Sequence, residues 1–122
     1  MAAPVVHFEV MGKDAKKLQS FYSKLFDWQL QMYEPMNYGV VFAAGNGNEV
    51  GKGSIGGGIG ATQEGQPGYV TFYVQVPDLK ATLKQAESMG GKTVVPPTEI
   101  PNMVTFAMFS DPEGNMVGLV KG

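Results

Sequence analysis

Two side chains that can do acid–base chemistry lie near the start of the chain, at His7 and Glu9. They stand two residues apart in the segment Val5–Val10, where apolar residues alternate with them. A period of two is typical of a strand with one buried face, so the two side chains share the opposite face. An imidazole titrates near pH ~6.5 and a carboxylate can accept a proton, so this pair forms the candidate catalytic group.

Each of these residues also has an interpretation without chemistry. His7 could be a histidine that is hydrogen-bonded in a polar pocket or an interface. Glu9 could be a carboxylate that is paired with a lysine or with Tyr73, because a carboxylate away from water needs a partner. The residues alone leave both interpretations open.

The chain repeats itself once, with a shift of 64 residues that brings Phe8 onto Phe72. The two copies form module 1, about residues 5–60, and module 2, about residues 69–121, joined by the Gly- and Pro-containing linker 61–68. We expect them to make one domain over residues 1–122. Other identical pairs are Val10 and Val74, Asp14 and Asp78, Val40 and Val104, Phe42 and Phe106, and Ala43 and Ala107.

Each module is predicted to fold as a strand, a helix and three further strands, which gives an α+β protein of two βαβββ modules. Asp14 and Asp78 stand where a helix N-cap belongs, and Gly90-Gly91 is a stop signal for the second helix. The predicted strands are Val5–Val10, Trp28–Tyr33, Tyr38–Ala44 and Ser54–Ile59 in module 1, and Tyr69–Val76, Lys92–Val95, Met103–Phe109 and Asn115–Val120 in module 2.

Composition excludes several classes of site and partner. The chain of 122 residues has no cysteine and one histidine, so thiolate metal sites, disulfides and a cysteine nucleophile are excluded. All nine of its Lys and Arg residues are lysines and its net charge is −2, which argues against nucleic acid as a partner. No apolar run approaches ~18 residues and no signal peptide is seen, so we expect a cytoplasmic protein with no membrane partner.

Motifs in both modules resemble the vicinal oxygen chelate superfamily, which includes glyoxalase I, bleomycin-resistance proteins and extradiol dioxygenases. Module 1 carries His7-Phe8-Glu9-Val10, Asp14, Phe21-Tyr22 and Leu25-Phe26-Asp27-Trp28, and module 2 carries Gly90-Gly91-Lys92, Asp111-Pro112-Glu113-Gly114-Asn115 and Leu119. The segment Val95–Pro101 is similar to a subgroup described as related to lactoylglutathione lyase. The resemblance implies a cupped mixed sheet with helices on its outer face and a small-molecule site on the concave face, often with one divalent metal.

The resemblance can be followed at each metal position. His7 matches the family's first ligand, which lies on the first strand seven residues before the capping aspartate. The equivalent position of module 2 is Thr71, and the acidic positions of the last strands fall on Gly118 and on Gly57 or Gly56. Since a catalytic metal takes about three protein ligands, we expect no metal or other cofactor, and glyoxalase I activity is disfavoured. A His7–Glu9 metal site shared between two chains remains the alternative.

Two glycine-rich segments are further candidates for sites. The loop 45–53 lacks the Gly-Lys-Ser/Thr ending of a phosphate-binding loop, so that interpretation is rejected. The run Gly56-Gly57-Gly58 predicts a strand that a backbone, a ligand or a second subunit approaches closely.

We therefore predict a small-molecule-binding protein or a metal-independent enzyme of lyase or isomerase type. The catalytic candidates are His7 and Glu9. The residues expected to contact the ligand are His7, Glu9, Trp28, Phe42, Thr71, Tyr73, Phe106 and Gly118. A homodimer is expected, because a sheet with one helix per four strands leaves a face and edges open. Alternatives are a metal-dependent lyase or isomerase with His7 as ligand, sequestration of a flat cationic compound, and a non-catalytic dimeric interaction module.

Overall fold

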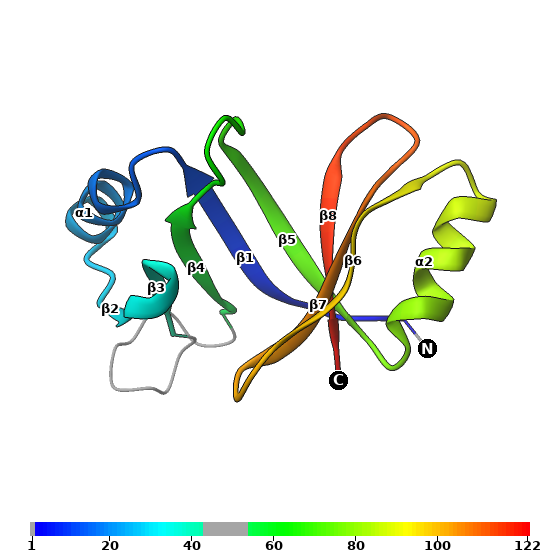
Figure 1. The fold of residues 1–122 in the computed structure, drawn as a ribbon. Helices are drawn as coiled ribbons and strands as arrows, with labels where there is room; N and C mark the ends of the chain where they lie inside the picture. The colour runs from blue at the N-terminus through cyan, green and yellow to red at the C-terminus, as the bar shows by residue number, and fades with distance from the viewer. Residues whose placement is uncertain (1, 43–53) are drawn as a thin grey trace. The chain divides into compact units, whose positions relative to one another are not determined.

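The computed structural model describes residues 2–42 and 54–122, which form two compact units (Figure 1). The first unit is His7–Val70, and the second combines Met1–Val6 with Thr71–Gly122. The first two residues of β1 therefore belong with the second unit, where the carbonyl of Pro4 accepts a hydrogen bond of 2.9 Å from the Gln75 N–H. The predicted α+β class with two βαβββ modules is confirmed.

The elements of module 1 follow in the predicted order. They are β1 (Val5–Gly12), α1 (Ala15–Phe26), β2 (Leu30–Tyr33), the 3-10 turn η1 (Glu34–Met36), β3 (Tyr38–Val41) and β4 (Gly56–Ala61). The strands lie in the order β2-β3-β4-β1, with β1 parallel to β4 and the other neighbours antiparallel. Glycine-rich β4 is thus an inner strand, which brings its backbone beside both β1 and β3.

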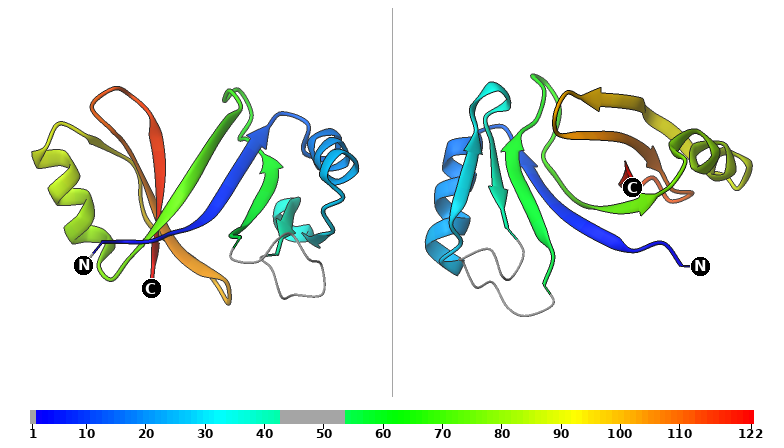
Figure 2. Two further views of the ribbon diagram at one scale, coloured as in Figure 1. Left: turned by 180° about the vertical axis from the view of Figure 1, so that it is seen from behind. Right: turned by 90° about the horizontal axis from the view of Figure 1, so that it is seen from below.

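Module 2 has the same plan. Its elements are β5 (Tyr69–Val76), α2 (Leu79–Ser88), β6 (Lys92–Ile100), β7 (Val104–Ser110) and β8 (Met116–Lys121). The strands lie in the order β5-β8-β7-β6, with β5 parallel to β8 and the other neighbours antiparallel. In each module the helix lies beside its strands, α1 against β4 and α2 against β6, β7 and β8 (Figure 2).

Both predicted helix caps are confirmed. The carboxylate of Asp14 accepts from the Lys17 N–H and that of Asp78 from the Ala81 N–H, each at 3.0 Å. At the end of α2, the predicted glycine stop is also present: Gly90 has a φ of 101°, and the Gly91 N–H donates to the Ala86 carbonyl at 2.8 Å.

Several strand limits were wrong. Trp28 lies outside β2, and the 3-10 turn η1 was not predicted. Strand β4 begins and ends two residues later than expected. Strand β6 continues past the predicted Val95 to Ile100 and includes Pro96-Pro97, which an edge strand with an irregular register can accommodate. The predicted strand end Ala43-Ala44 and the loop 45–53 lie outside the described residues.

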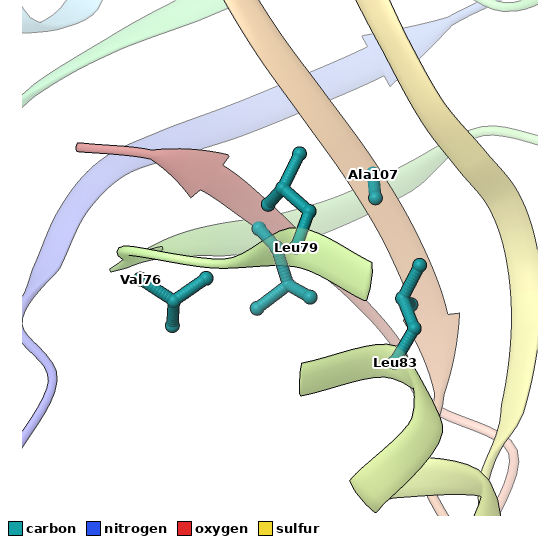
Figure 3. Close-up of a cluster of buried hydrophobic side chains, with 5 residues drawn as sticks. Val76, Leu79, Leu83 and Ala107 are labelled. Atoms are coloured by element: carbon teal, nitrogen blue, oxygen red, sulfur yellow. The ribbon is translucent and has the colours of Figure 1, made fainter. Parts of the chain in front are cut away.

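The apolar core differs between the two units. In the second unit, one face of β5, β7 and β8 packs against α2 (Figure 3). The buried cluster consists of Val76, Leu79, Leu83, Ala107 and Leu119. In the first unit, the described buried apolar side chains include Ala15, Val41 and Ile59. In the described parts of the chain, neither helix is long and apolar enough to cross a membrane.

A buried amide supports α1 of the first unit. Gln19 is 6% exposed, and its Nε2 donates to the carbonyl of Ile59 at 2.8 Å and to that of Asn37 at 3.2 Å. These bonds join the middle of the helix to β4 and to the residue before β3. The hydrogen bonds of Gln19 therefore help to hold α1 against its strands, whereas apolar side chains hold α2.

Replacement of Gln19 by alanine is expected to lower the free energy of unfolding by about 1–3 kcal/mol, because two buried hydrogen bonds are lost and a small cavity forms. The exposed Gln85→Ala on α2 is the matched control, with a change expected within about 0.5 kcal/mol. Urea denaturation measures both variants. Equal losses for the two would contradict the role assigned to the Gln19 amide.

Candidate functional site

The predicted placement of His7 and Glu9 on one face of a strand is confirmed. In the parallel pairing of β1 with β4, His7 lies beside Gly56 and Glu9 beside Gly58. Phe8, between them, points to the other face, where its ring occupies the space that a Cβ of Gly57 would need, at 2.4 Å. The polar pair is therefore on the face of β1 opposite to Phe8.

A tyrosine hydroxyl joins the two candidate residues. The Oη of Tyr38 lies 2.9 Å from Nε2 of His7 and donates to Oε2 of Glu9 at 2.8 Å. The hydroxyl of Tyr69 donates to the other carboxylate oxygen, Oε1, at 3.1 Å. Glu9 is 6% exposed, so these bonds satisfy a carboxylate that is almost out of contact with water. We call His7, Glu9, Tyr38 and Tyr69 the carboxylate cluster.

The single phenolic hydrogen of Tyr38 sets the direction of the chain of bonds. Because that hydrogen is donated to Glu9, the phenol oxygen can only accept from His7. Nε2 of His7 is therefore the nitrogen that carries the hydrogen. The two rings are nearly parallel, with an interplanar angle of 15° and centroids 6.4 Å apart.

Burial and charge set the protonation of His7 and Tyr69 near neutral pH. Burial lowers the pKa of His7 below its ordinary value of 6.5, so the imidazole is neutral. Burial raises the pKa of Tyr69 well above its ordinary range, and the nearby negative charge and hydrogen bond of Glu9 raise it further. Tyr69 therefore keeps the hydrogen that it donates to the carboxylate.

Tyr38 and Tyr69 were missed as site residues. The signal for Tyr38 was the glycine spacing in β4. A Cβ on Gly58 would lie 1.8 Å from the Tyr38 oxygen, and one on Gly60 would lie 2.7 Å from its Cδ1. The group that approaches Gly58 and Gly60 closely is the side chain of Tyr38, the first residue of β3. Gly58 and Gly60 are two residues apart and face the same side of the sheet as the His7 and Glu9 side chains on β1.

The assignment of Gly57 to the acidic metal-ligand position of module 1 was wrong. Gly118 lies beside Tyr73 in the pairing of β5 with β8, and Glu9, the repeat equivalent of Tyr73, lies beside Gly58. The module 1 counterpart of Gly118 is therefore Gly58. Gly57 faces the other side of the strand, because successive residues of a strand alternate between faces.

The predicted residues of module 2 share a face in the second unit. The Tyr73 ring occupies the space that a Cβ of Gly118 would need, at 2.3 Å, and its hydroxyl lies 3.9 Å from Sδ of Met108. Thr71 donates to the carbonyl of Met116 at 2.6 Å. Phe106 lies on this face too, because its neighbour Ala107 points into the core with α2.

The structure does not bring Trp28 together with His7 and Glu9. Its ring centroid lies 5.4 Å from that of Phe8, 5.0 Å from Phe26 and 6.2 Å from Tyr22. Trp28 thus packs on the face of β1 opposite to the carboxylate cluster. Phe42, also predicted to contact a ligand, directly follows β3 and is half-buried.

The described residues do not fit the divalent metal that the resemblance implies. They contain no group of three or more His, Cys, Asp or Glu side chains that could hold a metal ion. In the first unit, Nε2 of His7 and Oε2 of Glu9 are both bonded to the Tyr38 hydroxyl. In the second unit, the Thr71 hydroxyl is bonded to a backbone carbonyl, and Gly118 offers no side chain.

Two surface cavities lie apart from these residues. One, of about 290 Å³, lies beside α2 and is lined by Met89, Phe109 and Pro112 among others. The other, of about 430 Å³, lies beside the start of α1 and is lined by Met11, Lys17 and Phe21 among others. Neither includes a residue of the carboxylate cluster.

Comparisons with known proteins agree with this fold. Residues 5–119 match the family model described as Glyoxalase/Bleomycin resistance protein/Dioxygenase superfamily. The chain is 31% identical over 111 residues to a glyoxylase-like domain-containing protein of Didymella fabae, with 88% of this chain and 84% of that protein covered. The chain therefore belongs to the glyoxalase/bleomycin resistance/dioxygenase superfamily.

Other relatives are longer or more distant. The chain is 32% identical over 73 residues to the Mycobacterium tuberculosis protein named "Putative glyoxylase CFP32", with 60% of this chain covered and only 28% of that protein. A methylmalonyl-CoA epimerase structure from Streptomyces coelicolor aligns with a TM-score of 0.69 at 10% identity, covering 100% of this chain and 96% of that one. A superfamily member from Vibrio splendidus aligns with a TM-score of 0.62 at 14% identity, covering 99% and 100%.

Stability is expected to depend on pH through His7. Because the pKa of His7 is lower in the folded protein than 6.5, the unfolded chain binds more protons between the two values. The free energy of unfolding therefore falls as the pH is lowered through this window and recovers as the pH is raised. Chemical denaturation from about pH 7.5 to about pH 5.5 should show this loss in the wild type and not in His7→Gln. Equal pH slopes in the two proteins would contradict it.

Removal of the Tyr38 hydroxyl is expected to destabilise the first unit. In Tyr38→Phe, Glu9 loses one of its two described phenol donors while still buried, at a cost of about 2 kcal/mol in the free energy of unfolding. Tyr22→Phe is the matched control, since among the described residues its hydroxyl makes no hydrogen bond. Its expected cost is below about 0.5 kcal/mol. Thermal and urea unfolding of both variants test the difference.

Proposed function

We propose that this chain binds a small organic molecule, without a metal ion, on the face of β1 that carries His7 and Glu9. The carboxylate cluster is the observation that carries the proposal. It places a buried carboxylate, a neutral imidazole and two phenols within one connected set of hydrogen bonds. Such a set is costly to build for packing alone, because every polar atom in it must be satisfied.

The cluster can move a proton as well as hold a ligand. A proton taken up by His7 can be passed on when Nε2 releases its hydrogen to the Tyr38 oxygen and the phenolic hydrogen moves to Oε2 of Glu9. The relay leaves a neutral imidazole and a protonated carboxyl group, so no atom or charge is lost. Since some structural neighbours are methylmalonyl-CoA epimerases, proton transfer at a carbon next to a carbonyl is the reaction class we assign to an enzymatic role.

Charge narrows the class of ligand. Glu9 is an acidic residue within the carboxylate cluster, and the chain has no arginine to pair with phosphate or carboxylate groups. A negative charge buried in the site favours neutral or cationic ligands over anionic ones. We therefore propose a neutral carbonyl compound as substrate, or a flat cation if the protein only sequesters its ligand.

The test has a binding step and a reaction step. A thermal-shift screen with neutral, cationic and anionic aromatic and carbonyl compounds finds ligands, and proton NMR in D2O then follows exchange of the hydrogen next to the carbonyl. His7→Gln and Glu9→Gln should fold and lower the exchange rate by about 100-fold or more. Glu113→Gln, in an exposed turn, should leave it unchanged.

Binding without exchange, lost in the same two variants, would assign the protein to ligand sequestration. If no compound shifts the melting temperature, or if His7→Gln and Glu9→Gln bind the ligand as the wild type does, the proposal is wrong. A non-catalytic interaction module then becomes the better account.

A further inference from the structure

The Tyr38 hydroxyl lies between the two side chains that could hold an ion, His7 and Glu9. One atom, its Oη, is within 2.9 Å of Nε2 of His7 and 2.8 Å of Oε2 of Glu9. A nitrogen and a carboxylate oxygen that face one common point are the kinds of donors that divalent first-row metals take. The phenol oxygen of Tyr38 is hydrogen-bonded to both of these donor atoms and blocks the space between them.

Strand β4, which lies beside His7 and Glu9, leaves space for the Tyr38 ring. Tyr38 Oη and Cζ lie 1.8 and 1.9 Å from the place of a Cβ on Gly58, so the ring and any side chain at position 58 exclude each other. Gly58 is also the residue beside Glu9 on β4. A side chain at position 58 could supply a third metal ligand only if the Tyr38 ring moved away. The Tyr38 ring can occupy this space because residue 58 is a glycine.

We propose that Tyr38 is the specificity-determining residue that keeps this site free of metal, by filling the position between His7 and Glu9. This proposal rests on the metal-free function proposed above, but it can be tested without an organic ligand. Removal of the phenol should convert the hydrogen-bonded pair into a weak site for a divalent cation, with water completing the coordination.

The experiment titrates purified protein with Zn²⁺ at about pH 7.5, by isothermal calorimetry and by thermal shift. Tyr38→Ala should bind Zn²⁺ at least about 10-fold more tightly than the wild type, and the second substitutions His7→Gln or Glu9→Gln should abolish the gain. Tyr22→Ala, which removes a ring from the opposite face, is the control for loss of an aromatic side chain. Its Zn²⁺ affinity should equal that of the wild type.

A second variant keeps the test decisive if Tyr38→Ala does not fold. Tyr38→His retains a ring beside the glycines and supplies a further nitrogen ligand, so it should also gain Zn²⁺ affinity that depends on His7 and Glu9. The proposal is overturned if neither variant exceeds the wild type, or if the gain survives loss of His7. It is also overturned if purified wild type holds stoichiometric metal that is lost in His7→Ala. The ligand screen is separate, so failure of one claim leaves the other to be judged by itself.

Discussion

The burial of one carboxylate is the constraint on which the first unit depends. Glu9, on β1, is 6% exposed, and an unpaired carboxylate at that burial would cost several kcal/mol. Two phenols, Tyr38 and Tyr69, meet the need from strands that are distant in the sequence. The glycines of β4 follow from the same constraint, since Gly58 and Gly60 leave the space in which the Tyr38 ring reaches the carboxylate.

The two modules use their equivalent faces differently although they share one fold. In module 1 the positions of Glu9 and Gly58 hold a charge and the phenol that bonds it. In module 2 the equivalent positions, Tyr73 and Gly118, are filled by the Tyr73 ring itself, with its hydroxyl against the sulfur of Met108. The two modules thus share the register of the first strand on the last, while the hydrogen-bonded carboxylate is found in module 1.

The site of this superfamily member is built around hydrogen bonds among His7, Glu9 and Tyr38. The family model places the chain in the glyoxalase/bleomycin resistance/dioxygenase superfamily, and the structural neighbours share its fold. Yet its His7 nitrogen and Glu9 oxygen meet at a phenol. The site is therefore polar through its hydrogen bonds. In a low-dielectric environment each hydrogen bond is stronger, and a polar group without a hydrogen-bond partner destabilises the fold more.

The sequence by itself determined the βαβββ repeat, both helix caps and the shared face of His7 and Glu9, because these follow from local periodicity and from side chains that bond their own backbone. The sequence also placed Thr71 and Tyr73 on the first strand of module 2 and Gly118 on its last strand, which are equivalent to the first and last strands of module 1. Tertiary structure alone decided that Tyr38 and Tyr69 complete the cluster, that Gly58 and not Gly57 faces it, and that Trp28 packs on the other side. Those outcomes depend on the register of β4 against β1 and of β3 against β4, and on the contact of Tyr69 with Glu9. The register between distant strands is set by long-range packing that no local pattern encodes.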